Sequence, residues 1–70
     1  MDVLVFSTSV KEQRQVSRVT TLLIKVTSIA KWNFDLEDCD NILRIEADGL
    51  SPRYIERLLQ NAGIHCQELD

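Results

Sequence analysis

The sequence predicts an α+β domain of two layers, in which one antiparallel sheet of four strands carries both helices on one face. Short apolar or alternating segments predict strands at residues 3–6, 32–36, 43–47 and 65–69. Longer segments with apolar residues at helical spacing lie between them, at residues 11–29 and 51–62. The order strand–helix–strand therefore occurs twice, which favours one sheet covered by two helices.

The first strand and the first helix differ sharply in pattern. Residues 3–6 (VLVF) are continuously apolar and too few for a helix, which predicts a central strand. From Lys11 onward, apolar residues recur at spacings of three, four and seven, which predicts a helix about five turns long. Its apolar stripe consists of Val16, Val19, Leu22, Leu23, Val26 and Ile29. Ser9 and Glu12 have the spacing of a capping box, in which two side chains bond the free N–H groups of a helix start.

A hairpin follows the first helix. Trp32, Phe34 and Leu36 alternate with polar residues, as in a half-buried strand. Residues 37–41 (EDCDN) are rich in side chains that bond their own backbone, which predicts a turn. Residues 43–47 alternate again and should pair back on the preceding strand, before Asp48 and Gly49 end the hairpin.

The second helix has clear limits. Ser51 is the expected N-cap, and Pro52 suits the first helical position. Its buried face should contain Ile55, Leu58, Leu59 and Ala62. Gly63 supplies a left-handed end, and residues 65–69 form a short last strand. This order is the split βαβ, or ferredoxin-like, arrangement.

Size and composition limit the functions to consider. The 70 residues form one expected domain, 1–70, and no Gly/Ser-rich or Pro-rich linker divides it. The longest apolar run, residues 3–6, is far below the ~20 residues that span a bilayer. We therefore expect no membrane association and, in the absence of a signal peptide pattern, a cytoplasmic location. With no export signal, the two cysteines are expected to be free thiols.

The charges are segregated along the chain, although the net charge is only −3. Residues 11–29 carry four basic side chains against one acidic one, and residues 35–48 carry six acidic against one basic. Solvated faces often look like this, but the arrangement also suits docking to a partner of complementary charge. Nucleic acid is not an expected partner, because the sequence pI is about 5.0.

A basic surface is the candidate binding site. Both helices should lie on one side of the sheet, so their basic side chains share one side of the molecule. These candidates are Arg14, Arg18, Lys25, Arg53 and Arg57. The partner that this surface predicts is an acidic protein.

The whole chain, from about Val3 to Leu69, resembles a heavy-metal-associated domain, the fold of copper chaperones and of the N-terminal modules of metal-pumping ATPases. The resemblance rests on the order and spacing of several segments. These are residues 6–10, Val19 with Leu22 and Leu23, residues 31–38, residues 42–49, and residues 55–64. It implies the ferredoxin-like fold, with the strands in the order fourth, first, third, second. It also implies helical faces that meet an acidic partner domain.

The metal ligands of that family are missing here. Members that carry Cu(I) or Zn(II) use a C-x-x-C pair on the loop before the first helix, because thiolates suit soft ions. Counting back from Val19, those two positions hold Glu12 and Gln15, which cannot hold Cu(I). Val10 stands where the family usually has a loop methionine that packs beneath the metal. No bound metal or other cofactor is therefore expected at this loop, and Glu12 is interpreted as a capping residue.

Other potential ligands do not converge in the expected fold. His65 and Cys66 are neighbours on a strand, so their side chains face opposite sides, and Cys66 is expected to pack inward. Cys39 should lie exposed in the hairpin turn, whose acidic residues lack the ligand spacing of a calcium loop. With the implied strand order, Cys39 and Cys66 lie about 14 Å apart at ~4.8 Å per strand, beyond the ~7 Å that a disulfide can bridge.

The sequence thus predicts a non-enzymatic domain. The chain has one His, no Gly-rich phosphate loop and no nucleophile beside a base. The favoured function is protein interaction through the basic helical face. The alternative is metal binding or transfer through ligands outside the family positions, such as Cys39, His65 or Cys66. A monomer or weak homodimer is expected, because Val3, Val5 and Ile42 could be exposed on the open face of the sheet.

Overall fold

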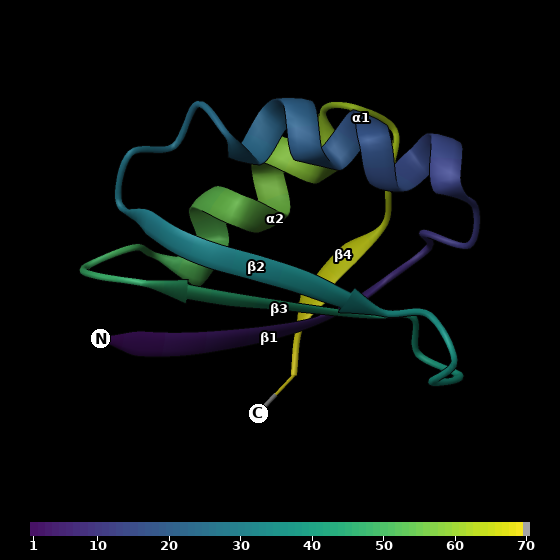
Figure 1. Ribbon diagram of the computed structural model, residues 1–70, viewed down its shortest axis with the longest axis horizontal. Helices are drawn as coiled ribbons and strands as arrows, with labels where there is room; N and C mark the ends of the chain where they lie inside the picture. Colours follow the sequence, from purple (N-terminus) through teal and green to yellow (C-terminus); the bar gives the residue numbers. More distant parts are fainter. Residues whose placement is uncertain (70) are drawn as a thin grey trace.

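The computed structural model describes residues 1–69, and its elements follow the predicted order (Figure 1). The strands are β1 (Asp2–Thr8), β2 (Ile29–Asp35), β3 (Ile42–Ala47) and β4 (Cys66–Glu68). The helices are α1 (Gln13–Leu23) and α2 (Pro52–Gln60), and both lie on the same side of the sheet (Figure 1). The predicted two-layer α+β, ferredoxin-like fold is confirmed. Asp70, the last residue of the expected 1–70 domain, lies outside the described residues.

The sheet has the strand order β2-β3-β1-β4, with every neighbouring pair antiparallel. This is the expected order, and it places β1 at the centre. In the register, Val5 pairs with Arg44 across β1 and β3, while Thr8 pairs with Cys66 across β1 and β4. Cys66 lies in β4 at one edge of the sheet, Cys39 lies in the turn between β2 and β3, and both are free thiols.

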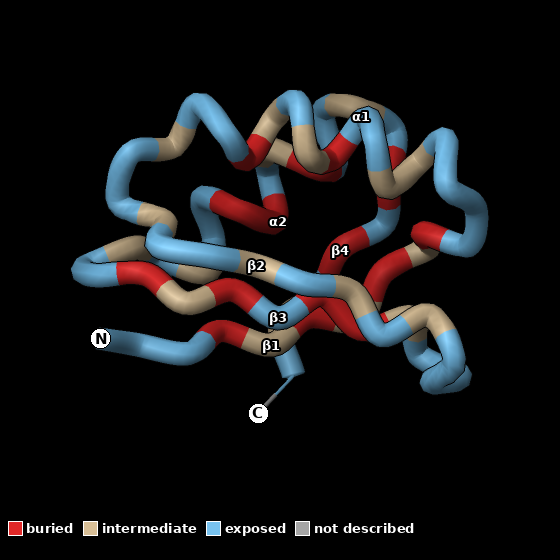
Figure 2. The backbone as a smooth tube through the Cα atoms, viewed as in Figure 1, coloured by how far each residue is buried: buried red, intermediate tan, exposed pale blue. Residues whose placement is uncertain are grey.

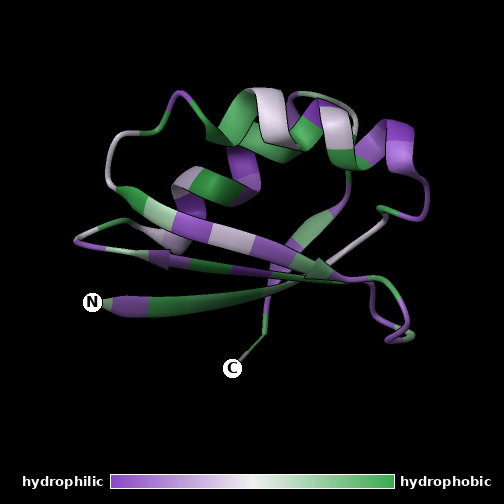
Figure 3. Cartoon of the chain, in the orientation of Figure 1, coloured by the Kyte–Doolittle hydropathy of each residue, from purple (hydrophilic) through white to green (hydrophobic). Residues whose placement is uncertain are grey.

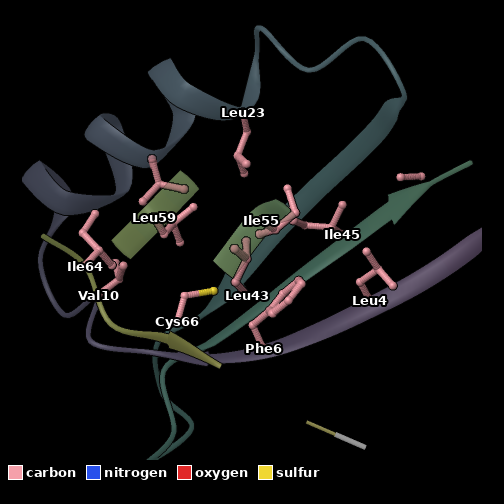
Figure 4. Close-up of a cluster of buried hydrophobic side chains, with 12 residues drawn as sticks. Leu4, Phe6, Val10, Leu23, Leu43, Ile45, Ile55, Leu59, Ile64 and Cys66 are labelled. Atoms are coloured by element: carbon pink, nitrogen blue, oxygen red, sulfur yellow. The ribbon is translucent and has the colours of Figure 1, made fainter. Parts of the chain in front are cut away.

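The core lies between the sheet and the helices, as Figure 2 shows by the buried positions on β1, β3 and α2. Alternate residues of each central strand point into it, which is the period of two that a half-covered strand requires. Figure 4 shows the side chains that the two layers share. They include Leu4, Phe6, Leu43 and Ile45 from the sheet, and Leu23, Ile55 and Leu59 from the helices. No helix within residues 1–69 has the length and apolar character needed to cross a bilayer.

The first helix is shorter than the five turns expected. It ends at Leu23, and two tight turns follow, in which the N–H of Val26 bonds the carbonyl of Leu23 and the N–H of Ile29 bonds the carbonyl of Val26. Ile29 already belongs to β2. The segment after Leu23 (IKVTSI) is rich in β-branched residues, which lose side-chain freedom in a helix.

The second helix begins as predicted and ends at Gln60, two residues before the predicted end. The Ser51 hydroxyl oxygen accepts a hydrogen bond from the N–H of Arg53 at 3.3 Å, with Pro52 in the first turn. Gly63 has φ +80°, the left-handed conformation that ends the segment.

The open face of the sheet is less apolar than expected. Val3 is 57% exposed, as proposed, and Val5 is half-buried. Ile42, however, is only 6% exposed, so the expectation that it adds to an exposed patch is wrong. Its neighbours on the same face of β3, Arg44 and Glu46, are charged.

Candidate functional site

The loop between β1 and α1 is turned toward the protein interior. Val10, near its middle, is fully buried, and Figure 4 shows it in the core cluster that also contains Ile64. In the heavy-metal-associated domains that the sequence resembles, the residue at this position packs beneath the metal ion. In this chain, Val10 anchors the loop by burying an apolar side chain.

Glu12 and Gln15 form the start of α1. Glu12 is the N-cap, with extended backbone angles, and Gln15 is the third helical residue. Gln15 Oε1 accepts hydrogen bonds from the N–H groups of Lys11 at 2.7 Å and Glu12 at 3.1 Å, and its Nε2 donates to the carbonyl of Ser9 at 3.3 Å. The capping pair is thus Glu12 with Gln15, and the predicted pair of Ser9 with Glu12 is wrong. Gln15 closes the loop at the place where a second metal ligand is implied by the resemblance.

Ser9 has a different partner from the one predicted. Its N–H donates to the carbonyl of His65 at 3.1 Å, and its Oγ accepts from the N–H of His65 at 2.9 Å. These two bonds continue the pairing of β1 with β4 by one residue. The pairing is a tertiary contact across 56 residues, so it could not be seen in the local sequence.

Thr8 ties the same loop to the hairpin turn, a role that sequence reasoning missed. Its hydroxyl donates to the carbonyl of Asn41 at 2.6 Å and accepts from the N–H of Val10 at 3.2 Å, while its own N–H donates to the carbonyl of Asp40 at 3.1 Å. The sequence feature that could have indicated this role is a threonine at the end of the first strand, two residues before a valine that is buried. The loop is therefore fixed on one side to β4 and on the other to residues 38–41.

Cys66 is fully buried, as predicted, and cannot act as a surface ligand. Desolvation by burial, helped by the charge of Glu56, raises the pKa of the Cys66 thiol to about 12. The thiol is therefore protonated at neutral pH, whereas metal binding needs a thiolate. His65 is exposed next to it in sequence, so the two side chains do not share a site.

The only cluster of three metal-type ligands within residues 1–69 is Asp38, Cys39 and Asp40, in the turn between β2 and β3. One ligand atom from each of these exposed residues lies within 4.8 Å of the others. Asp38 Oδ1 already accepts the N–H of Asp40 at 2.9 Å, and Asn41 has a positive φ of 50°, which Asn tolerates well. The predicted exposure of Cys39 is confirmed.

The basic candidates fall into two groups. Arg14 and Arg18 lie one turn apart on α1, Arg57 lies on α2, and all three are exposed. Within residues 1–69 none of them forms an ion pair. Lys25 is also exposed and unpaired among these residues, but it lies beyond the end of α1 at Leu23, so it is not on the first helix as expected.

Arg53 belongs to an internal network instead. Its guanidinium pairs with Glu56 and, at 3.3 Å, with Glu68. The other carboxylate oxygen of Glu56 accepts the N–H of Glu68 at 2.7 Å. The hydrogen bond from Arg53, followed by the bond from the Glu68 N–H, holds the pKa of Glu56 below its usual value. Sequence reasoning missed Glu56, whose only signal was its i,i+3 spacing from Arg53.

Comparison with known proteins supports the fold. No protein-family model matches the sequence, and no curated protein matches it. Among solved structures, the chain is similar to the yeast copper transporter domain Ccc2a, which is described in its apo and Cu(I)-loaded states. The TM-score is 0.83, with 14% sequence identity over 97% of this chain and 94% of that one. At this identity the likeness shows the shared architecture.

Proposed function

We propose that this domain is a non-enzymatic interaction module that binds an acidic protein surface through the outer side of its helices. The binding residues are Arg14 and Arg18 of α1, with Arg57 of α2 as a third exposed guanidinium group on the helical layer. The observation that carries the proposal is that these three guanidinium groups are exposed and have no ion-pair partner within residues 1–69. Arg53 is set aside, because Glu56 and Glu68 already balance its charge.

The residues of the loop before α1 support a docking function better than a metal-carrying one. The architecture that presents the helices is shared with Ccc2a. At the loop, however, Glu12 and Gln15 offer one carboxylate and one amide in place of two thiolates, and the Gln15 amide is engaged in closing the helix start. We therefore infer that this chain retains a partner-binding surface and has lost metal transfer. A reducing cytoplasmic location fits the exposed thiol of Cys39.

Charge reversal tests this function. The tagged chain is used to capture partners, and the captured acidic protein is then titrated against the wild type and R14E/R18E. We expect the double variant to bind at least tenfold more weakly, since like charges across an interface are strongly unfavourable. The control is K31E/R44E, which makes the same charge change on exposed positions of the sheet and also removes the surface ion pair of Lys31 with Glu46. Equal binding by all three proteins contradicts the proposal.

A second candidate function has one observation in its favour, the close ligand atoms of Asp38, Cys39 and Asp40. Zn(II) or Cu(I) is titrated while the backbone amide signals are followed. Shifts centred on residues 38–41 that disappear in C39S support metal binding at the turn. Shifts centred on residues 12–15 instead support the carrier function of the resembling family.

A further inference from the structure

Two exposed surfaces of opposite charge lie near the loop that precedes α1. We call the first the basic α1 end, consisting of Lys11, Arg14 and Arg18. We call the second the acidic turn, consisting of Asp35, Glu37, Asp38 and Asp40. All seven side chains are exposed, and within residues 1–69 none of them takes part in an ion pair. Each surface therefore presents charge that its own chain does not neutralise.

The structure holds these two surfaces at the same end of the molecule. In Figure 1 the start of α1 and the turn between β2 and β3 both lie at the right-hand end, and Figure 3 shows both segments as hydrophilic. The bonds of Thr8 to the carbonyls of Asp40 and Asn41 fix the turn to the segment that leads into α1. The two surfaces thus flank one rigid loop, in a fixed relative position, without pairing with each other.

We propose that a second copy of this chain binds at this end, with the basic α1 end of each copy against the acidic turn of the other. A two-fold axis repeats every contact twice, so a surface that carries adjacent patches of opposite charge is complementary to itself. Such a pairing closes after two copies and does not extend into a fibre. Because its contacts are exposed ion pairs, the dimer is weak and sensitive to salt.

The same dimer regulates the proposed function, and this part of the inference depends on that function. Arg14 and Arg18 are used in both contacts, so a chain that is paired with a second copy cannot dock on an acidic partner through them. The partner must then compete with the second copy, and its apparent affinity should fall as the concentration of the domain rises.

Sedimentation equilibrium tests the pairing. At an ionic strength of about 0.02 M and millimolar protein, the average mass should rise from 8.0 kDa toward twice that value, and it should return to the monomer value at about 0.5 M salt. R14E/R18E and E37K/D40K should each remain monomeric at low salt. Within residues 1–69 the side chains of Glu37 and Asp40 make no hydrogen bond, so their replacement leaves the turn intact. K31E/R44E, on the opposite face of the sheet, should dimerise like the wild type.

The decisive sample is an equimolar mixture of R14E/R18E with E37K/D40K. In the mixture the unchanged acidic turn of R14E/R18E meets the unchanged basic α1 end of E37K/D40K, which restores one of the two contacts, so a dimer should reappear at low salt. A monomeric wild type at low salt, or a mixture that stays monomeric, overturns the inference. Amide spectra of each variant verify that it is folded. If the wild type is monomeric but still captures an acidic partner, the dimer is refuted and the proposed function is not. If R14E/R18E binds that partner as tightly as the wild type does, the proposed function is refuted.

Discussion

The carboxylate of Glu56 in α2 accepts the backbone N–H of Glu68 in β4 at 2.7 Å. Glu56 is only 8% exposed, and its other oxygen binds Arg53, which in turn reaches Glu68. One buried side chain thus attaches a strand of three residues to the second helix. A second bond joins the same two elements, from Nε2 of Gln60 to the carbonyl of Cys66 at 3.1 Å, and β1 is the neighbour of this strand in the sheet.

Replacing Glu56 should therefore destabilise the fold. E56Q keeps the shape of the side chain but replaces one of the two acceptor oxygens by an NH₂ donor, which then faces the donor of either Arg53 or Glu68. We expect the free energy of unfolding to fall by about 1.5–3 kcal/mol, the range for hydrogen bonds to a charged group. Urea unfolding followed by circular dichroism measures this. E37Q, at an exposed acidic position, should change stability by less than about 0.5 kcal/mol, and an equal loss in both variants would contradict the assigned role.

The same carboxylate should make stability depend on acid pH. Its pKa lies below the usual value near 4.5 in the folded chain, so above that pH both states are ionised and the contribution is fully present. As the pH falls below 4.5, the unfolded state binds the proton first, and the free energy of unfolding decreases until the folded pKa is passed. Urea midpoints measured from neutral pH downward should show this decrease in the wild type. The decrease should be smaller in E56Q, and identical profiles would rule out Glu56 as its source.

The two thiols should differ strongly in reactivity. Cys39 is exposed, and Cys66 is fully buried with its pKa raised to about 12. A disulfide reagent added to the native protein at neutral pH should modify one thiol at once and the second only when urea unfolds the chain. C39S should lose the fast reaction and retain the slow one. Two fast thiols would contradict the burial of Cys66, and no fast thiol would contradict the prediction that Cys39 is unpaired.

Burial of Cys66 also predicts a loss of stability in alkali. Above its usual pKa of 9.0, the thiol ionises in the unfolded state but stays protonated in the folded state up to about pH 12. The free energy of unfolding should therefore decrease as the pH rises from 9.0 toward 12. The difference between the wild type and C66A gives the decrease that is due to this thiol, since the variant has no thiol to ionise at this position. A parallel decrease in both proteins would show that other groups cause it.

Gln15 should be important for stability and not for chemistry. Its amide binds the N–H groups of Lys11 and Glu12, so Q15A leaves the start of α1 without these bonds. We expect a loss of about 1 kcal/mol, as for the removal of other helix caps. Q13A, an exposed position one residue into the helix, is the control and should be nearly neutral. Thermal unfolding of both variants decides whether the loop depends on this side chain.

The sequence predicted the fold because each element carried its own local signal. The alternation of Trp32 with Phe34, and the cap formed by Ser51 and Pro52, act within a few residues and were confirmed. The predicted end of α1 was wrong. Val26 and Ile29 continue the helical spacing of apolar residues by chance, but the chain there forms turns and then a strand.

The candidate site was harder to predict, because distant contacts decide it. Glu12 fits a capping box both as the partner of Ser9 and as the cap for Gln15, and the choice between them depends on the pairing of Ser9 with His65. The burial of Glu56 depends equally on a strand that comes twelve residues later. The basic residues were visible as charges, but only the structure shows that Arg53 is paired with Glu56 and Glu68, whereas Arg14 and Arg18 form no ion pair among residues 1–69.

The outer strand β2 is interrupted by a bulge or irregularity between Ile29 and Lys31. A regular, flat strand at the edge of a sheet has unpaired backbone N–H and C=O groups. These groups can pair with a strand of another molecule, and such pairing starts amyloid-like growth. The interruption and the exposed side chain of Lys31 spoil that template at the start of β2. At this end of β2, the sheet is therefore protected against pairing edge to edge with the sheet of another molecule.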